Sequence, residues 1–323
     1  MNAVSQATKR VPLLERAKRL NIGQYVIYLA FAVTFVAFSI VLGDQGFLSS
    51  DNLLNILRQS AIVGVIAVGM TFVIANAEID LSVGSLAGLA SVITAMAVSH
   101  WGTLTGILCG LCVGLVVGAI NGALVAWVKI PSFLVTLAMM GIAYGAAQWI
   151  TSSAPQPIMD RTYNLLLGSG DFGPVPGLVV WFLIFAVLGA VLLKHTRFGR
   201  RVVSVGANPI ASAYSGISVA WTKFIVMLVA AVAAAVGGML YAGRLQSGRY
   251  QWGQGDEMNA IAAVILGGTA LAGGRGSVVG TVFGALFMGL INNGLILAGL
   301  SYPQQQVVRG VIIILAVALG RKN

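Results

Sequence analysis

The chain has 323 residues, of which 58% are apolar and 9% are charged, with 19 basic and 9 acidic side chains. Soluble domains carry about 25% charged residues, so a soluble globular protein is excluded, and so is a disordered chain, which would be poor in apolar residues. Two cysteines, both inside one apolar run, exclude a disulfide scaffold.

The apolar residues gather into ten segments that we expect to cross a lipid bilayer, which takes roughly 20 residues per helix. The first is too long for a secretory signal and leads into polar residues rather than a cleavage site. The eighth is short and contains Gly267 and Gly268, which indicates a broken or half-crossing helix. The expected spans are 25–42, 53–75, 82–98, 104–128, 132–151, 177–193, 221–242, 258–271, 277–298 and 304–319.

The basic residues indicate how these spans are oriented. With ten crossings, fourteen of the 19 basic side chains fall on the side of the N-terminus, which the positive-inside rule places in the cytoplasm. We therefore expect a basic cytoplasmic segment at 1–24, one transmembrane domain at 25–319 and a cytoplasmic tail at 320–323. Topology explains the net charge of +10, so no nucleic-acid partner is expected.

The 41 glycines predict close helix packing. Several lie four residues apart, which puts them on one face of a helix. In lipid, where hydrophobic drive between helices is absent, small residues let helix backbones approach closely. These glycines are Gly84 and Gly88 in the third span, Gly110, Gly114, Gly118 and Gly122 in the fourth, and Gly276, Gly280 and Gly284 at the ninth.

A polar run interrupts the apolar sequence between the second and third spans. It contains Asn76, Glu78, Asp80 and Ser82. One interpretation is a non-helical break that lines the path of a substrate, as in many transporters. The other is a cytoplasmic turn in which Asp80 or Ser82 caps the third span. The sequence leaves both open.

Further polar residues lie at membrane depth or near the outer surface. A second acidic pattern, Asp256 to Asn259, opens the eighth span. Asn292 and Asn293 could bind a hydroxylated substrate, with interhelical hydrogen bonds as the alternative. Arg58 and Arg309 could extend to the interface or pair with Asp51 or Glu257. The candidate substrate-path residues are Asn76, Glu78, Asp80, Ser82, Asn292 and Asn293.

The longest cytoplasmic loop, 194–220, is expected to contain a short helix. Asn208 can cap its first turn, and Pro209 suits the first helical position. Such a helix on the cytoplasmic face could bind a partner protein, or the loop could be a plain connector.

The motifs of an enzyme are missing from the sequence. A P-loop pattern is absent, so ATP is not expected to bind to this chain. The two histidines, His100 and His195, fall on opposite sides of the membrane and cannot form a metal site. We therefore expect no catalytic residues, cofactor or metal here.

Three motifs resemble those of the ribose-type sugar permeases of ABC importers. The first is Ile79-Asp80-Leu81-Ser82-Val83-Gly84-Ser85, the second is the loop from His195 to Ile217, and the third is the glycine-rich block from Ala260 to Thr281. Asn292 and Asn293 follow at the family's spacing, and the match covers residues 45–319. Glu78 departs from the glycine that is frequent in the family, and the stretch 208–214 lacks the usual acidic and arginine residues.

The resemblance implies an all-α bundle of the type II ABC-importer kind in a bacterial inner membrane. It implies a cytoplasmic ATPase that carries ATP and Mg, a sugar-binding protein at the outer face, a second permease copy or paralogue, and surrounding membrane lipid. The residues that it assigns to ATPase coupling are Arg197, Gly206, Asn208, Pro209, Ser215 and Gly216.

Three alternatives to a sugar importer remain at this stage. A secondary transporter or channel would use Glu78 or Asp80 to carry an ion. A branched-chain amino-acid permease would need charged partners for a zwitterion. A membrane scaffold would transport nothing.

Overall fold

The fold is almost entirely helical. The computed structural model describes residues 26–173 and 175–320, so the predicted cytoplasmic segment at 1–24 and most of the predicted tail lie outside the described residues. The helices are α2 (Val26–Val41), α3 (Ser50–Ala75), α4 (Val83–Ala123), α5 (Ser132–Thr151), α6 (Arg161–Asn164), α7 (Gly177–His195), α8 (Arg197–Ala207), α9 (Pro209–Tyr214), α10 (Val219–Arg244), α11 (Asp256–Leu266), α12 (Val278–Leu297) and α13 (Tyr302–Gly320).

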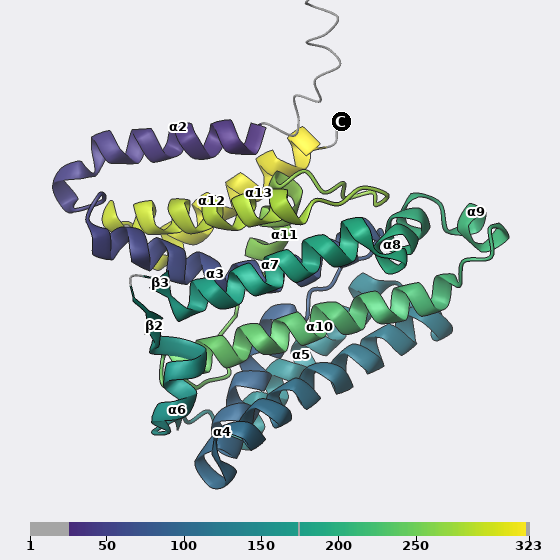
Figure 1. Ribbon diagram of the computed structural model, residues 1–323, viewed down its shortest axis with the longest axis horizontal. Coiled ribbons are helices and arrows are strands. Elements are labelled where there is room, and N and C mark those ends of the chain that lie inside the picture. Colours follow the sequence, from purple (N-terminus) through teal and green to yellow (C-terminus); the bar gives the residue numbers. More distant parts are fainter. Residues whose placement is uncertain (1–25, 174, 321–323) are drawn as a thin grey trace, which may run out of the picture.

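Short elements complete the structure. They are a 3₁₀ turn, η2 (Gly43–Gln45), two π-helical turns, η3 (Leu124–Val128) and η4 (Leu165–Ser169), and four two-residue strands, β1 (Gln156–Pro157), β2 (Asp171–Phe172), β3 (Val175–Pro176) and β4 (Ser247–Gly248). β1 pairs with β4 and β2 pairs with β3, both antiparallel. In Figure 1, β2, β3 and α6 lie at one end of the long helices, and α8 and α9 lie at the other.

Six helices of the described chain are long and apolar enough to span a membrane. They are Ser50–Ala75, Val83–Val128, Ser132–Thr151, Gly177–His195, Val219–Arg244 and Val278–Leu297. Large apolar side chains remain exposed on several of them, including Trp149 on α5 and Val187 on α7. Such surface suits lipid as the surrounding solvent, so the chain is a multi-pass membrane protein.

The longest helix, α4, reverses direction at Gly102. This glycine has φ +84° and ψ 175°, a conformation that residues with a Cβ rarely adopt. After it, Gly106 lies against Val98, and Gly110 lies against Thr94, so the two halves pack on each other. The halves correspond to the third and fourth predicted spans.

Helix α3 forms the centre of the bundle. From Ser60 to Ala75 every residue except Val63 is buried. Helices α7, α10, α11 and α12 all pack against it. A helix that is apolar on all sides is expected in such a central place.

The predicted glycine face of the fourth span is confirmed, and its partner is α10. A Cβ at each of these glycines would lie 2.3–2.9 Å from its nearest neighbouring atom, so only glycine fits without a shift. The main contacts are Gly110 with Met239, Gly114 with Ala235, Gly118 with Ala231, and Gly122 with Phe224. A second glycine contact joins α12 to α11, where Gly284 meets the Ala263 carbonyl.

Helix α11 is the short segment that the sequence predicted. Its 11 residues extend about 16 Å, roughly half of a hydrocarbon core. It ends at Gly267, which packs against the backbone of Gly280, and Gly268 then takes φ +88°. The helix therefore starts and ends earlier than the predicted 258–271, because the glycine pair ends it.

An ion pair and a helix cap stabilise the end of the bundle where β2, β3 and α6 lie. Arg58 pairs with Asp171 at 2.8 Å, so of the interpretations open for Arg58 the alternative of a pair with Asp51 is wrong. The two residues come from α3 and β2, whose proximity is a tertiary feature. Asp160 caps α6 by accepting the Tyr163 N–H, and this hydrogen bond lowers the pKa of its carboxyl.

We predict that Gly238→Ala destabilises the protein. A Cβ at this position in α10 would lie 2.1 Å from the carbonyl oxygen of Ala87 in α4, and a backbone atom cannot move aside cheaply. Overpacking of this kind costs about 1–3 kcal/mol, so the midpoint of thermal unfolding in detergent should fall. The matched control is Gly141→Ala in α5, where no atom lies within 4 Å. Equal midpoints for both variants would contradict the prediction.

Candidate functional site

The polar run between the second and third predicted spans forms a non-helical link between α3 and α4, residues 76–82. The link is held by side chains of the next helix along the bundle. Ser132 of α5 accepts the Ile79 N–H, and Thr136 accepts the Leu81 N–H, each at 3.1 Å. These bonds satisfy N–H donors of the link, which have no helical partner because the link is not helical.

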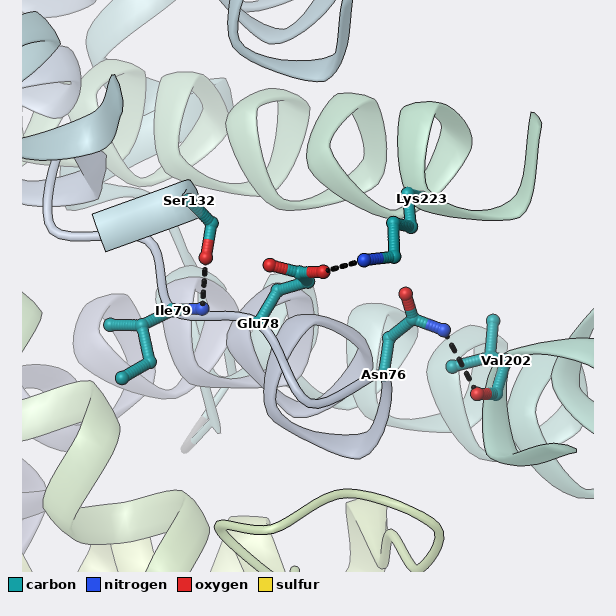
Figure 2. Close-up of polar contacts among 6 residues, drawn as sticks. All are labelled: Asn76, Glu78, Ile79, Ser132, Val202 and Lys223. Carbon is teal, nitrogen blue, oxygen red and sulfur yellow. Dashed lines mark hydrogen bonds and ion pairs between the residues drawn. The ribbon is translucent and has the colours of Figure 1, made fainter. Parts of the chain in front are cut away.

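Glu78 of the link forms an ion pair with Lys223 near the start of α10. Their carboxylate oxygen and ammonium nitrogen are 2.5 Å apart, and Figure 2 shows the two side chains pointing toward each other. Only 10% of the Glu78 side chain is exposed, against 27% for Lys223. The pair therefore joins the link to α10 and neutralises a mostly buried acid.

Asp80 is completely buried and organises the start of α4. Its Oδ1 accepts hydrogen bonds from both the backbone N–H and the hydroxyl of Ser82. Asn121, from the second half of α4, donates in turn to the Ser82 hydroxyl. Ser82 is the N-cap residue of α4, yet its side chain does not bond to the first turn. Neither Asp80 nor Ser82 therefore bonds to an N–H of the first turn of α4, so the alternative in which one of them caps this helix is wrong.

The link also contacts the predicted coupling loop. Asn76 donates to the Val202 carbonyl of α8 at 3.0 Å (Figure 2). Gly206, at the end of α8, lies so close to the Ala75 carbonyl that a Cβ would be 2.0 Å away. The N–H of Gly274 donates to the same carbonyl. Three segments far apart in sequence thus meet where α3 ends.

The coupling loop contains two helices where the sequence predicted one. The predicted helix is α9: Asn208 accepts the Ala211 N–H at 2.9 Å, and Pro209 occupies the first turn. Gly216 follows α9 with φ +79°. Helix α8 was missed. Its available signal was the N-cap Thr196, which accepts the Gly199 N–H, ahead of a mixed run of arginines and valines. Arg197, Asn208, Pro209, Ser215 and Gly216 are exposed, whereas Gly206 is buried.

Asn292 and Asn293 lie on α12, in a different part of the bundle. Asn293 exchanges hydrogen bonds with Asn52 of α3. Asn292 accepts a hydrogen bond from Arg309, whereas the alternative of a pair between Arg309 and Glu257 is not formed. The structure therefore gathers four of the six predicted path residues at the link and places the other two in interhelical contacts. Their role in a substrate path stays a prediction.

Sequence reasoning overlooked residues 245–255, which follow α10. This stretch carries Arg249, Tyr250, Gln251, Trp252 and Gln254, in an otherwise apolar chain. The signal in the sequence that could have identified this stretch is the group of aromatic and amide side chains between two apolar spans. The acidic pattern 256–259, which follows this stretch, lies next to the first of the three family motifs. Its Glu257 Oε2 is close to Gly84 at the start of α4.

The polar groups of the site join the link to its neighbouring helices. Among the described residues, no group of three or more His, Cys, Asp or Glu side chains could hold a metal ion. The polar groups bond instead to one another and to backbone across helices α3, α4, α5, α8 and α10. One side-chain oxygen each of Asn76, Asp80 and Asn121 is buried without a hydrogen-bond partner.

Comparison with known proteins identifies the family. Residues 52–317 match the family described as branched-chain amino acid transport system / permease component. The chain belongs to this permease family. Among the similar proteins, the ribose import permease of Bacillus subtilis is 41% identical over 92% of each chain, and that of Escherichia coli is 39% identical over 87% of this chain and 88% of its own. The xylose transport system permease of Haemophilus influenzae is 33% identical over 95% of this chain and 98% of its own.

These relatives confirm the resemblance that the three motifs indicated. They cover the link, the coupling loop and the glycine-rich block together. The permease is therefore similar over nearly its whole length to proteins named for the transport of pentoses.

We predict that the Glu78–Lys223 pair is coupled in a double-mutant cycle. Glu78→Gln and Lys223→Gln each leave a partly buried charge without its partner, whereas the double variant leaves neither. Because Lys223 is partly exposed, the interaction should be worth about 1–2 kcal/mol. Thermal unfolding of the four proteins in detergent measures it. Strictly additive losses would show that the pair contributes nothing.

Proposed function

We propose that this protein is the permease subunit of an ATP-driven ABC importer that carries a monosaccharide, of the pentose class, into the cytoplasm. The observation that carries the proposal is the match to permeases named for ribose and xylose, which extends along about nine-tenths of this chain and of theirs. The presence of the link and of the capped helix α9 supports it.

The proposed topology has ten crossings with both termini in the cytoplasm of a bacterial inner membrane. The six long spans become seven because α4 reverses at Gly102, and α2 and α13 supply two more. The tenth is α11 together with residues 245–255 before it, because α11 alone extends only half of the hydrocarbon core. This even number leaves the basic ends of the chain on one side. It also puts α8, with its exposed arginines, and the following α9 on that same side.

In the proposed mechanism a cytoplasmic ATPase, which binds ATP and Mg, pushes on α9 and its flanking residues. Movement passes from α8 to the end of α3, because Gly206 packs on Ala75 and Asn76 bonds to Val202. From there it reaches the link and, through Glu78 and Lys223, α10. A binding protein delivers the sugar at the outer face, and a second permease copy or paralogue completes the path between the subunits.

The residues at the link are proposed to line the inner end of that path. Glu78 is its least buried acid, and its neighbours Asn76, Asp80 and Ser82 fix the shape of the backbone. Asn292 and Asn293 are the weaker candidates, because their amides are bound to Arg309 and Asn52.

Two other functions receive less support. An ion-driven transporter would carry its ion on Glu78 or Asp80, whereas Glu78 is paired with Lys223 and one carboxylate oxygen of Asp80 accepts two hydrogen bonds from Ser82. Branched-chain amino acids appear in the family description, but the similar proteins named above are sugar permeases.

The direct test is purification of the chain from its host in mild detergent, followed by reconstitution with the co-purifying proteins. We expect an ATPase with a P-loop in near-equal amount, and uptake of labelled ribose or xylose that requires ATP and a binding protein. Solute uptake by the chain alone, driven by an ion gradient, would overturn the proposal.

We predict that Asn208→Ala lowers sugar uptake about fivefold. Loss of an N-cap costs roughly 1 kcal/mol, which weakens α9 as a rigid contact for the ATPase. The matched control is Ser49→Ala, which removes the N-cap of α3 at the opposite end of the bundle. Insertion into the membrane should be normal for both variants. Equal uptake by both would show that α9 is not the coupling element.

A further inference from the structure

Residues 245–255, here called the dipping segment, run back into the bundle after α10 ends. They follow the first half of α4 in the direction opposite to the helix. The contacts are Gly248 with Ser91 and Ala95, the Tyr250 carbonyl with Gly88, and Gly253 with Gly84. From Ala95 to Gly84 is eleven residues, so the segment descends about 16 Å along α4.

The backbone of the dipping segment is irregular and tightly held. A Cβ at Gly88 would lie 2.5 Å from the Tyr250 carbonyl oxygen, and the N–H of Arg249 donates to the Ser91 hydroxyl. Gly253 and Gly255 have φ values of +82° and +88°. These contacts fix the side chains that the segment presents.

One side of the dipping segment is left uncovered by residues 26–173 and 175–320. Gln251 and Gln254 are exposed, and Tyr250, Trp252 and Glu257 are partly exposed. Irregular backbone at membrane depth is tolerated only where protein buries it or where it lines a water-filled cavity. Polar side chains facing lipid are costly for the same reason. The exposed side of the segment therefore faces an aqueous path.

The aromatic rings on this side are arranged in pairs. Tyr250 meets Tyr144 of α5 edge to face, with ring centroids 5.3 Å apart. The Arg249 guanidinium lies over the Trp252 ring at 5.4 Å, and the Trp252 indole donates to the Ser247 carbonyl. Gln148 is one turn beyond Tyr144 on α5, which puts both on one helix face.

We propose that Tyr144, Tyr250, Gln251 and Gln254 form a surface that binds the monosaccharide as it crosses the membrane. A sugar presents hydroxyls around its edge and C–H bonds on its faces. Amides both donate and accept hydrogen bonds, which matches hydroxyls, and an aromatic ring offers an apolar body with a polar tip to the sugar face. Charged groups are absent from these four side chains, which suits a neutral solute. The inference rests on the proposed function and names its substrate contact.

The test is uptake of labelled ribose and xylose by the full transporter, the permease with its ATPase and binding protein, in vesicles. Tyr250→Ala and Gln254→Ala should each lower uptake about tenfold, because each removes one contact to the sugar and the loss of a typical hydrogen bond corresponds to a factor of about ten. Tyr250→Phe, which keeps the ring, should keep most of the uptake. ATP hydrolysis stimulated by the binding protein should change less than twofold in all three variants. The matched controls are Gln45→Ala and Tyr302→Ala, exposed residues of the same types outside this surface.

Two results separate the possible failures. If the wild type takes up sugar and Tyr250→Ala and Gln254→Ala match it, this inference is overturned while the proposed function stands. If the wild type takes up neither sugar with ATP present, the proposed function itself fails.

A second measurement does not depend on transport. In a chain with Cys109 and Cys112 replaced by Ser, Gln254→Cys should react with a hydrophilic maleimide, because it faces water. Val187→Cys, an exposed apolar position in α7, should not react. The unfolding midpoint of each variant shows whether the protein is folded. If folded Gln254→Cys is labelled no more than Val187→Cys, the aqueous path is overturned.

Discussion

The structure depends on direct contact between backbones. Helices in lipid gain little from apolar side chains alone, so they associate where small residues let main chains meet. In this permease the contact recurs at α4 with α10, at α11 with α12, and at the end of α3. At Ala75 it is closest to function, since one carbonyl lies against both Gly206 and Gly274. A movement at the cytoplasmic helices cannot be absorbed by flexible side chains there.

The same constraint explains why polar residues sit where helices are interrupted. The link at 76–82 and the dipping segment both break helical hydrogen bonding, and both recover it with side chains of neighbouring helices. The two breaks approach each other at the start of α4, just after the link, where Gly84 lies against Gly253 of the dipping segment and Glu257 of α11. One is tied to the coupling loop and the other presents aromatic and amide groups. Their contact offers a short physical route from the coupling loop to the dipping segment.

Much of the fold was predictable because lipid makes the sequence signal strong. Long apolar runs, the glycine periodicity, the half helix before Gly267 and the cap at Asn208 are all local patterns, and all are present in the structure. Helix α8 was missed, and the acidic partners considered as alternatives for Arg58 and Arg309 are not the ones that the structure gives them. Ion-pair partners depend on which helices become neighbours, and apolar periodicity carries no such information.

The sequence by itself determined a multi-pass membrane protein of the permease family, with its spans, its orientation signal and its three motifs. The tertiary structure alone decided that Glu78 pairs with Lys223, that Asn76 contacts α8, and that Asn292 and Asn293 lie apart from the link. It alone brought Tyr144 to Tyr250 across a hundred residues of chain. The physical reason is that span formation is a transfer of local segments into lipid, whereas these contacts arise from helix packing, which joins residues distant in sequence.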